Sequence, residues 1–206
     1  ASQTYAPSAF LLYLGVEGDV DPLAHHSLVL PTDWDPHFER IFDDPAWPDN
    51  PAYYLSVASK TDDTVAPDGH HAVVVLVPIA PGLDDGPEQR AAYRGFVLED
   101  LADRTGVDLR DRIVFEESAC VSDFTTRFGD PDGTALGLAH TLRQTGPLRP
   151  DRRGGTTGLY YAGAYTRPGV GMPMCLISGE HTARAIVEDA PVPGASPSKP
   201  RPDSTP

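Results

Sequence analysis

The stretch GLYYAGAYTRPGVGMPMCLISGEHTARAI, residues Gly158 to Ile186, decides the fold prediction for this chain. Its pattern predicts a strand over Gly158–Ala164, a glycine-rich turn, and a helix from about Met172 to Asp189 with a proline in its first turn. Glycines in such a turn let a ligand touch the backbone, and the helix N-terminus offers unpaired N–H groups and a partial positive charge. A tight strand-to-helix turn without a ligand explains the pattern equally well.

The residues upstream of this stretch predict strands interrupted by helices. Apolar runs bounded by turn residues predict strands at Ala9–Val16, Ser27–Leu30, Tyr53–Ala58, Ala72–Ala80 and Arg112–Ala119. Helical spacing and capping residues predict helices at Asp35–Phe42, Pro87–Thr105 and Ser122–Phe128, with Asp35 and the pair Ser122-Asp123 as N-caps. The polar segment Leu142–Gly155 contains proline and glycine and predicts a loop.

Charge is the outlying property of the 206-residue chain. Asp plus Glu number 30 against 16 Lys plus Arg, which gives a net charge of −14 and a pI near 4.7. This charge repels phosphate backbones and excludes nucleic-acid binding as a main task. Aspartate outnumbers glutamate, and lysine occurs only at Lys60 and Lys199. Such a surface stays hydrated where salt screens charge, so it predicts a high-salt cytosol, with an ordinary acidic cytosolic protein as the alternative.

Few side chains outside the glycine-rich turn predict chemistry. The thiols of Cys120 and Cys175 lack metal-like spacing and indicate a reducing compartment. No cluster of further ligands surrounds the pairs His25-His26 and His70-His71, so no metal site is predicted. The sequence shows no Ser-His-Asp or Cys-His arrangement, so no catalytic side chain is predicted. No apolar run reaches the ~18 to 20 residues of a spanning helix, so membrane contact is expected to be peripheral.

The glycine-rich stretch resembles the C-terminal flavin-binding signature of bacterial and archaeal carotenoid desaturases of the phytoene desaturase type. The matching positions of that signature are Gly158, Leu159, Tyr160, Gly163, Ala164, Pro168, Gly169, Gly171 and Pro173. Family-like segments also occur upstream, at Ser8–Val16, His25–Leu30, Ser59–Asp62, Ala66–Pro78, Arg112–Phe124 and Ala135–Pro150. The resemblance covers almost the whole chain apart from its tail, and together with the charge it indicates a desaturase from a halophilic archaeon.

The resemblance implies an α/β fold with a mixed sheet, of the flavin amine-oxidase-like FAD/NAD(P)-binding superfamily. Residues 1–153 would form the substrate-binding part, and residues 154–189 the C-terminal strand, turn and helix of the FAD-binding domain. The remainder, residues 190–206, is rich in proline, serine and charge and is expected to be disordered.

The resemblance also implies an FAD-dependent oxidoreductase that dehydrogenates phytoene, or a related carotenoid precursor, toward lycopene. It would work in the cytoplasm at a membrane surface, on a long-chain polyene substrate. In such enzymes the flavin ring lies against the turn and the helix start. The cofactor-binding residues implied here are therefore Gly163, Ala164, Tyr165, Thr166, Pro168, Gly169, Gly171, Met172 and Pro173. A flavin-dependent carotene isomerase or a later-acting carotenoid desaturase would share these motifs.

Two departures from the family pattern stand out. Tyr165, Thr166 and Arg167 replace the usual small residue, Thr, and His or Gln before the Pro-Gly pair. The chain also has no Gly-x-Gly-x-x-Gly motif after an N-terminal strand, the element that holds the ADP part of FAD. The expectation is a C-terminal fragment that lacks the dinucleotide-binding half, binds FAD poorly and is inactive alone, so that a non-catalytic fragment is a further alternative.

Overall fold

The structure, a computed structural model, describes residues 3–190. The chain forms two compact units, unit 1 over Ala1–Ala139 and unit 2 over His140–Pro206. The boundary expected after residue 153, between the substrate-binding part and the FAD-binding part, falls inside unit 2 and stays a prediction. The expected disordered tail lies outside the described residues, except for Ala190.

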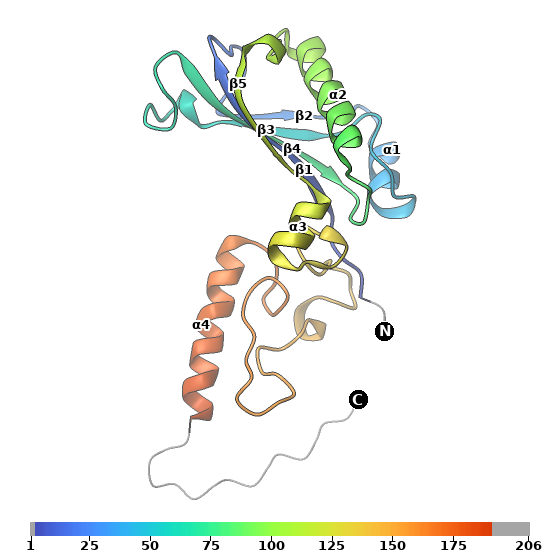
Figure 1. The fold of residues 1–206 in the computed structure, drawn as a ribbon. Coiled ribbons are helices and arrows are strands. Elements are labelled where there is room, and N and C mark those ends of the chain that lie inside the picture. Colours follow the sequence, from blue (N-terminus) through green and yellow to red (C-terminus); the bar gives the residue numbers. More distant parts are fainter. Residues whose placement is uncertain (1–2, 191–206) are drawn as a thin grey trace, which may run out of the picture. The chain divides into compact units, whose positions relative to one another are not determined.

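Unit 1 is built on a five-stranded sheet with the order β2-β3-β4-β1-β5 (Figure 1). Its strands are β1 (Ser8–Glu17), β2 (His26–Val29), β3 (Tyr53–Val57), β4 (His70–Ile79) and β5 (Ile113–Ala119). All five strands predicted from apolar runs in residues 1–139 are confirmed. The α/β class is confirmed too, but every neighbouring pair is antiparallel, so the expected mixed sheet is wrong in this unit. The reason is that β1 lies between β4 and β5, so the helical crossover from β4 to β5 joins strands that are not direct neighbours.

That crossover is α2 (Pro87–Thr105), which leads from β4 to β5 and covers one face of the sheet (Figure 1). Its Val97, Leu98 and Leu101 are buried in one core cluster with Phe10 and Leu12 of β1. The predicted helical spacing is therefore confirmed, and Gly106 ends the helix in the left-handed conformation.

Two shorter helices of unit 1 begin differently from the prediction. Helix α1 (Asp35–Phe38) starts after Trp34 and continues as a π-helix over Glu39–Asp43, so Asp35 lies in the first turn and is not the N-cap. Helix α3 (Val121–Phe128) has Cys120 as its N-cap residue. The Cys120 N–H donates to the Asp123 carboxylate over 2.9 Å, because a carboxylate at the third helical position can reach back to the cap.

The face of the sheet opposite α2, which we call the open face, is largely apolar, although a neighbouring row on it carries His26, Ser56 and Glu117. Strand register places Leu28, Tyr54, Leu76, Leu11 and Ala119 in one row across all five strands. These residues alternate with the buried residues of the core face, as side chains on a strand must. Leu28 is 67% exposed, and Leu11, Tyr54 and Leu76 are half-buried. An apolar surface of this extent on a strand face indicates a binding surface.

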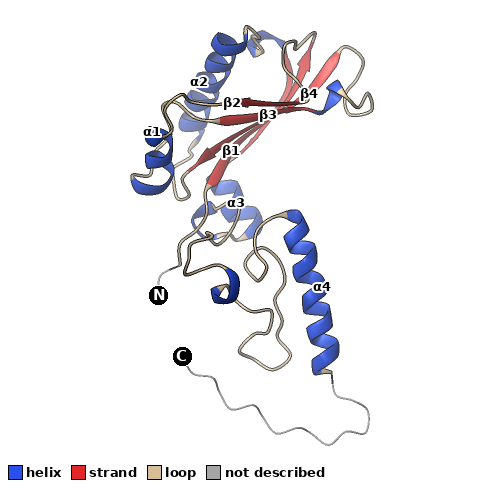
Figure 2. Ribbon diagram, turned by 180° about the vertical axis from the view of Figure 1, so that it is seen from behind, coloured by secondary structure: helices blue, strands red, loops and turns tan. Residues whose placement is uncertain are grey.

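Unit 2 contains one long helix, α4 (Met172–Asp189), as predicted (Figure 2). The strand predicted over Gly158–Ala164 is wrong: only an isolated bridge joins Tyr160 to Arg153. A strand needs a neighbouring strand to pair its backbone groups. The described part of unit 2 offers only residues 152–154 for that pairing, through Gly154 N–H to Leu159 O and Tyr161 N–H to Arg152 O, both at 2.8 Å. The predicted loop is confirmed apart from a short 3-10 turn at Gly146–Leu148.

Candidate functional site

The turn before α4 is held by two buried hydroxyl groups. Ser178, fully buried in α4, accepts the Gly163 N–H over 3.1 Å and lies 2.7 Å from the Thr166 hydroxyl. The Thr166 hydroxyl also lies 3.0 Å from the Gly163 carbonyl oxygen, to which it can donate. One turn further along α4, Thr182 donates to the carbonyl oxygen of Tyr161 over 2.9 Å. These bonds fix the backbone of residues 161–166 against the polar, buried stripe of α4.

A buried arginine holds the other side of the turn. The Arg149 side chain is 1% exposed, and its guanidinium donates to the carbonyl oxygens of Ala164 at 2.5 Å and Gln144 at 3.2 Å. Burial lowers the pKa of this guanidinium, since the charged form loses its water. Arg149 therefore ties the loop before the turn to the turn itself.

The glycines of the turn leave its backbone accessible. Gly163 has φ +112°, and a Cβ built on it would meet no atom within 4 Å. Gly171, the N-cap residue of α4, has φ +116° and its nearest contact would be 3.9 Å away. The first turn of α4 has neither a side-chain cap nor an acidic residue. Its backbone N–H groups are therefore available to an electron-rich ligand atom.

The structure places the predicted site residues in two groups. Gly163, Ala164 and Thr166 lie around Ser178 and Arg149, whereas Gly171, Met172 and Pro173 form the start of α4. Tyr165, half-buried, lies within the first group, and the segment between the two groups holds Pro168, which is exposed, and Gly169, which is buried.

The prediction missed Ser178 and Arg149, which organise the turn. Ser178 could have been noticed, because it is a polar residue that interrupts an apolar helical run. Arg149 could not, because it stands in a polar segment and nothing in the local sequence indicates that it is buried. Arg167, at the position that departs from the family pattern, forms an ion pair with Asp151.

These features fit a flavin. Open space beside two glycines admits a flat ring next to the backbone, and the uncapped helix start presents donors and a positive dipole to the electron-rich edge of such a ring. The residues that would hold it are those of the turn and the first turn of α4.

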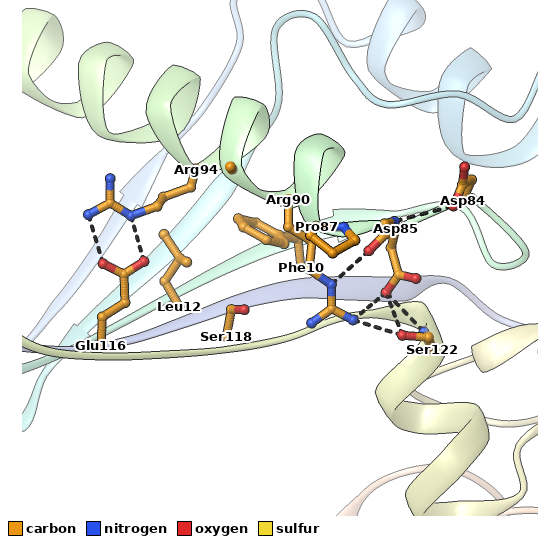
Figure 3. A pocket seen from close by; sticks show the side chains of 12 residues that line it. Phe10, Leu12, Asp84, Asp85, Pro87, Arg90, Arg94, Glu116, Ser118 and Ser122 are labelled. Carbon is orange, nitrogen blue, oxygen red and sulfur yellow. Dashed lines mark hydrogen bonds and ion pairs between the residues drawn. The ribbon is translucent and has the colours of Figure 1, made fainter.

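A cavity of about 670 Å³ in unit 1 is lined by charged side chains, and all of these except Asp84 form ion pairs (Figure 3). Arg90 of α2 bonds to Asp85 at 2.5 Å and to Asp123 at 2.7 Å. The Ser122 N–H donates to the same Asp85 carboxylate over 3.0 Å, and Arg94 forms a two-pronged pair with Glu116 at 2.5 and 2.7 Å. The network joins the start of α2 to the start of α3, so its role is structural.

This network predicts a pH dependence of stability. Burial by itself raises the pKa of Asp85, but the Ser122 N–H and the Arg90 guanidinium outweigh it and hold that pKa below its usual range. The stabilisation is therefore complete at neutral pH and lost as the pH falls below about 4. Asp85→Asn is expected to lower the free energy of unfolding by about 2 to 3 kcal/mol at pH 7.

Urea unfolding at several pH values measures this effect. The stability difference between wild type and Asp85→Asn is expected to shrink as the pH is lowered from 7 to 3. The matched control is Asp84→Asn, because Asp84 is the exposed neighbour and should change stability little at any pH. An equal loss of stability in both variants would refute the assignment.

Within residues 3–190, no group of three or more His, Cys, Asp and Glu side chains is placed to hold a metal ion. None of the helices in that range is both long enough and apolar enough to cross a membrane. Cys120 is buried, and burial raises the pKa of its thiol to about 12, which makes it unreactive.

The chain belongs to the family of flavin-containing amine oxidoreductases, whose model matches residues 27–187. A carotenoid 3,4-desaturase of Haloarcula japonica is 69% identical over 188 residues, covering 91% of this chain and 38% of the relative. A zeta-carotene-forming phytoene desaturase of Myxococcus xanthus is 32% identical over 93% of this chain and 38% of its own length. The expected resemblance to carotenoid desaturases, with a halophilic source, is confirmed.

A solved structure supports the fold. An oxidoreductase from Methanosarcina mazei matches with a TM-score of 0.52 at 15% sequence identity, over 88% of this chain and 35% of the other. The chain thus spans 38% of the length of the two curated relatives and 35% of the solved chain.

Proposed function

We propose that the chain is part of an FAD-dependent desaturase that introduces double bonds into an acyclic carotenoid. The observation that carries the proposal is the apolar open face of unit 1, which fits an uncharged linear hydrocarbon. Family membership and the carotenoid desaturases among its relatives support the same substrate class. The turn before α4 is proposed as the flavin contact, with Gly163, Gly171 and the N–H groups of the first turn of α4 as its main elements.

Two apolar cavities mark a track along the open face. One, of about 460 Å³, is lined by Ala72 and Val74 of β4 together with Tyr13 and Phe115. The other, of about 310 Å³, is lined by Leu76 and Pro78 of the same strand. Residues 72, 74, 76 and 78 alternate along one strand, so they share one face and span about 20 Å. An extended polyene would lie along this track.

The protein's own residues have three tasks in this proposal. The open face binds the polyene and excludes water from it. The bonds from Ser178 and Arg149 keep the turn rigid, so that the backbone donors stay aimed at one position. A bound flavin would supply the oxidising power, because its full reduction takes up the two electrons and the two protons that leave a pair of adjacent C–H bonds when the double bond forms. No acid or base from the chain is required for that step.

Of the specific reactions, 3,4-desaturation is favoured over the dehydrogenation of phytoene toward lycopene. The specific observation is that identity to the 3,4-desaturase is 69%, against 32% for the phytoene desaturase of Myxococcus xanthus. Action at a membrane surface in the cytoplasm also remains part of the proposal, because the substrate class partitions into lipid.

A chimera tests the function. Residues 1–190 of this chain replace the matching segment of the Haloarcula japonica desaturase, and the chimera is expressed in cells that supply its carotenoid substrate. We expect pigments with absorption shifted to longer wavelength, because each added double bond extends the conjugated system. Changed isomers without new double bonds would indicate an isomerase. No change, with a folded and flavin-loaded chimera, would refute the proposal.

A further inference from the structure

Within residues 3–190, one side of strand β5 faces no other strand. β5 is the last strand of the sheet and pairs only with β1, in one continuous register over Phe115–Ala119. The N–H and C=O groups on its outer side are therefore left without a neighbouring strand in this part of the chain. Such a row of backbone groups is a template on which a further strand can pair.

The opposite edge of the sheet is protected against pairing in a way that β5 is not. Strand β2 has only four residues, His26–Val29, and Pro31 follows it closely, so it offers few backbone groups to a neighbour. β5 has seven residues and contains no proline. The register shift opposite Gly15 and Val16 is confined to the start of β5 and leaves Phe115–Ala119 available for pairing.

The apolar side chains at this edge also favour a neighbouring strand. Val114 is 59% exposed and Phe115 is 55% exposed. They lie in a run of five successive exposed residues, 114–118. A strand placed beside β5 would remove apolar surface of both side chains from water, which is favourable in proportion to the area buried.

The two carboxylates of β5 differ in their partners. Glu116 points toward α2 and forms a two-pronged pair with Arg94 at 2.5 and 2.7 Å (Figure 3). Glu117 points to the other face of the sheet, because side chains alternate along a strand. It is exposed and forms no ion pair with any residue that the structure describes. A cation on an adjacent strand would complement it.

A second copy of this chain is a poor match for the edge. The antiparallel register that overlaps Phe115–Ala119 completely places Glu117 opposite Glu117 of the second copy, and like charges directly opposite destabilise a sheet. The net charge of −14 adds to this repulsion. The chain covers 38% of each of two curated relatives, so most of the length of those desaturases lies outside the matched segment and can supply a strand.

We propose that the outer side of β5 is an interaction surface that accepts a strand from the part of these desaturases that this chain does not cover. The strand pairs with the backbone of Phe115–Ala119, placing an apolar side chain beside Phe115 and a lysine or arginine beside Glu117. The sheet of unit 1 then has six strands, and the open face is wider by one strand. The inference rests on family membership and on the geometry of β5, and does not depend on the reaction proposed above.

Hydrogen exchange read by mass spectrometry tests the pairing. The 206-residue chain is compared, at one KCl concentration, with the chimera that carries its residues 1–190 in the Haloarcula japonica desaturase. N–H groups along an antiparallel strand point alternately to its two sides, so about half of those in Phe115–Ala119 bond to β1 in both proteins. We expect the others to exchange freely in the chain and at least about tenfold more slowly in the chimera. The amides of β2 are expected to exchange alike in both.

Substitutions on β5 separate strand pairing from a general stabilisation of the chimera. Phe115→Asp removes the apolar contact and Glu117→Lys puts like charges opposite each other, so each is expected to abolish most of the added protection. In the 206-residue chain, Phe115→Asp should change the exchange of β5 by less than about twofold, because the side chain is already largely exposed. The matched control is Leu28→Asp on the other edge strand, 67% exposed, which should leave the protection of β5 intact.

Equal exchange of the Phe115–Ala119 amides in the chain and in a folded chimera would overturn the proposal, and so would equal effects of Phe115→Asp and Leu28→Asp on β5. Slow exchange of all these amides in the chain alone would overturn it whether or not the chimera folds. If that protection were lost on dilution, the occupant would be a second copy. These results do not require desaturation, so they are distinct from a chimera that folds but makes no new double bonds.

Discussion

Gly133→Ala is expected to lower the free energy of unfolding by about 3 kcal/mol or more. A Cβ at Gly133 would lie 2.2 Å from the carbonyl oxygen of Val121, a backbone atom of α3. Neither segment can move freely, because Ser8 of β1 donates to the Gly133 carbonyl over 2.6 Å and the Gly82 N–H donates to the Asp132 carbonyl over 2.7 Å. The clash therefore has to be relieved by moving α3 or by breaking the bonds that hold residues 132 and 133 to Ser8 and Gly82.

Thermal unfolding followed by circular dichroism measures the effect, and a fall in Tm of about 10 °C is expected. Gly129→Ala is the matched control, because Gly129 has a similar φ of +68° and a Cβ there would meet no atom within 4 Å. The control should cost only about 1 kcal/mol, the usual penalty of a left-handed alanine. Similar Tm values for the two variants would contradict the role of the close approach.

Gly163→Val, introduced into the chimera described above, is expected to reduce desaturation by about 100-fold. Gly163 has φ +112°, outside the region that branched side chains adopt, and its open side is where the flavin ring is proposed to lie. The added side chain would occupy that space and displace the N–H that bonds to Ser178. Flavin bound per protein, read from its visible absorption, is expected to fall together with the activity.

Gly158→Val is the control for backbone strain. Gly158 also has a positive φ, +82°, and also faces open space, but it lies outside the hydroxyl network of the turn. If Gly158→Val loses as much flavin and activity as Gly163→Val, general strain explains both, and the assignment of Gly163 to the flavin contact fails. A chimera that keeps its flavin and activity with Gly163→Val would exclude the contact directly.

The local sequence pattern predicted secondary structure correctly where an element is specified by its own residues. Apolar runs with turn residues at both ends located the strands of unit 1, because burial and the strand period act over a few residues. Helical spacing located α2 for the same reason. The prediction of a strand over Gly158–Ala164 failed because a strand needs a neighbouring strand to pair its backbone groups. The local sequence does not indicate whether such a neighbour is present.

The site was predictable in the same unequal way. Gly163 and Gly171 could be singled out because only glycine combines a positive φ with free access to the backbone. Arg149 could not, because its importance comes from its burial, at 1% exposure, within a segment of ordinary polar composition. The N-caps of α1 and α3 were misplaced because the residues at those positions, Trp34 and Cys120, are not among the types that usually cap a helix.

By itself the sequence determined the strands and main helices of unit 1, helix α4, the acidic composition and the glycine-rich turn of a flavoprotein family, since each of these depends on residues close together in the chain. Only the tertiary structure decided that the sheet is antiparallel and that Leu11, Leu28 and Leu76 share one open face. The physical reason is that strand register and burial arise from contacts between segments that are distant in the chain, and these contacts cannot be predicted from local sequence patterns.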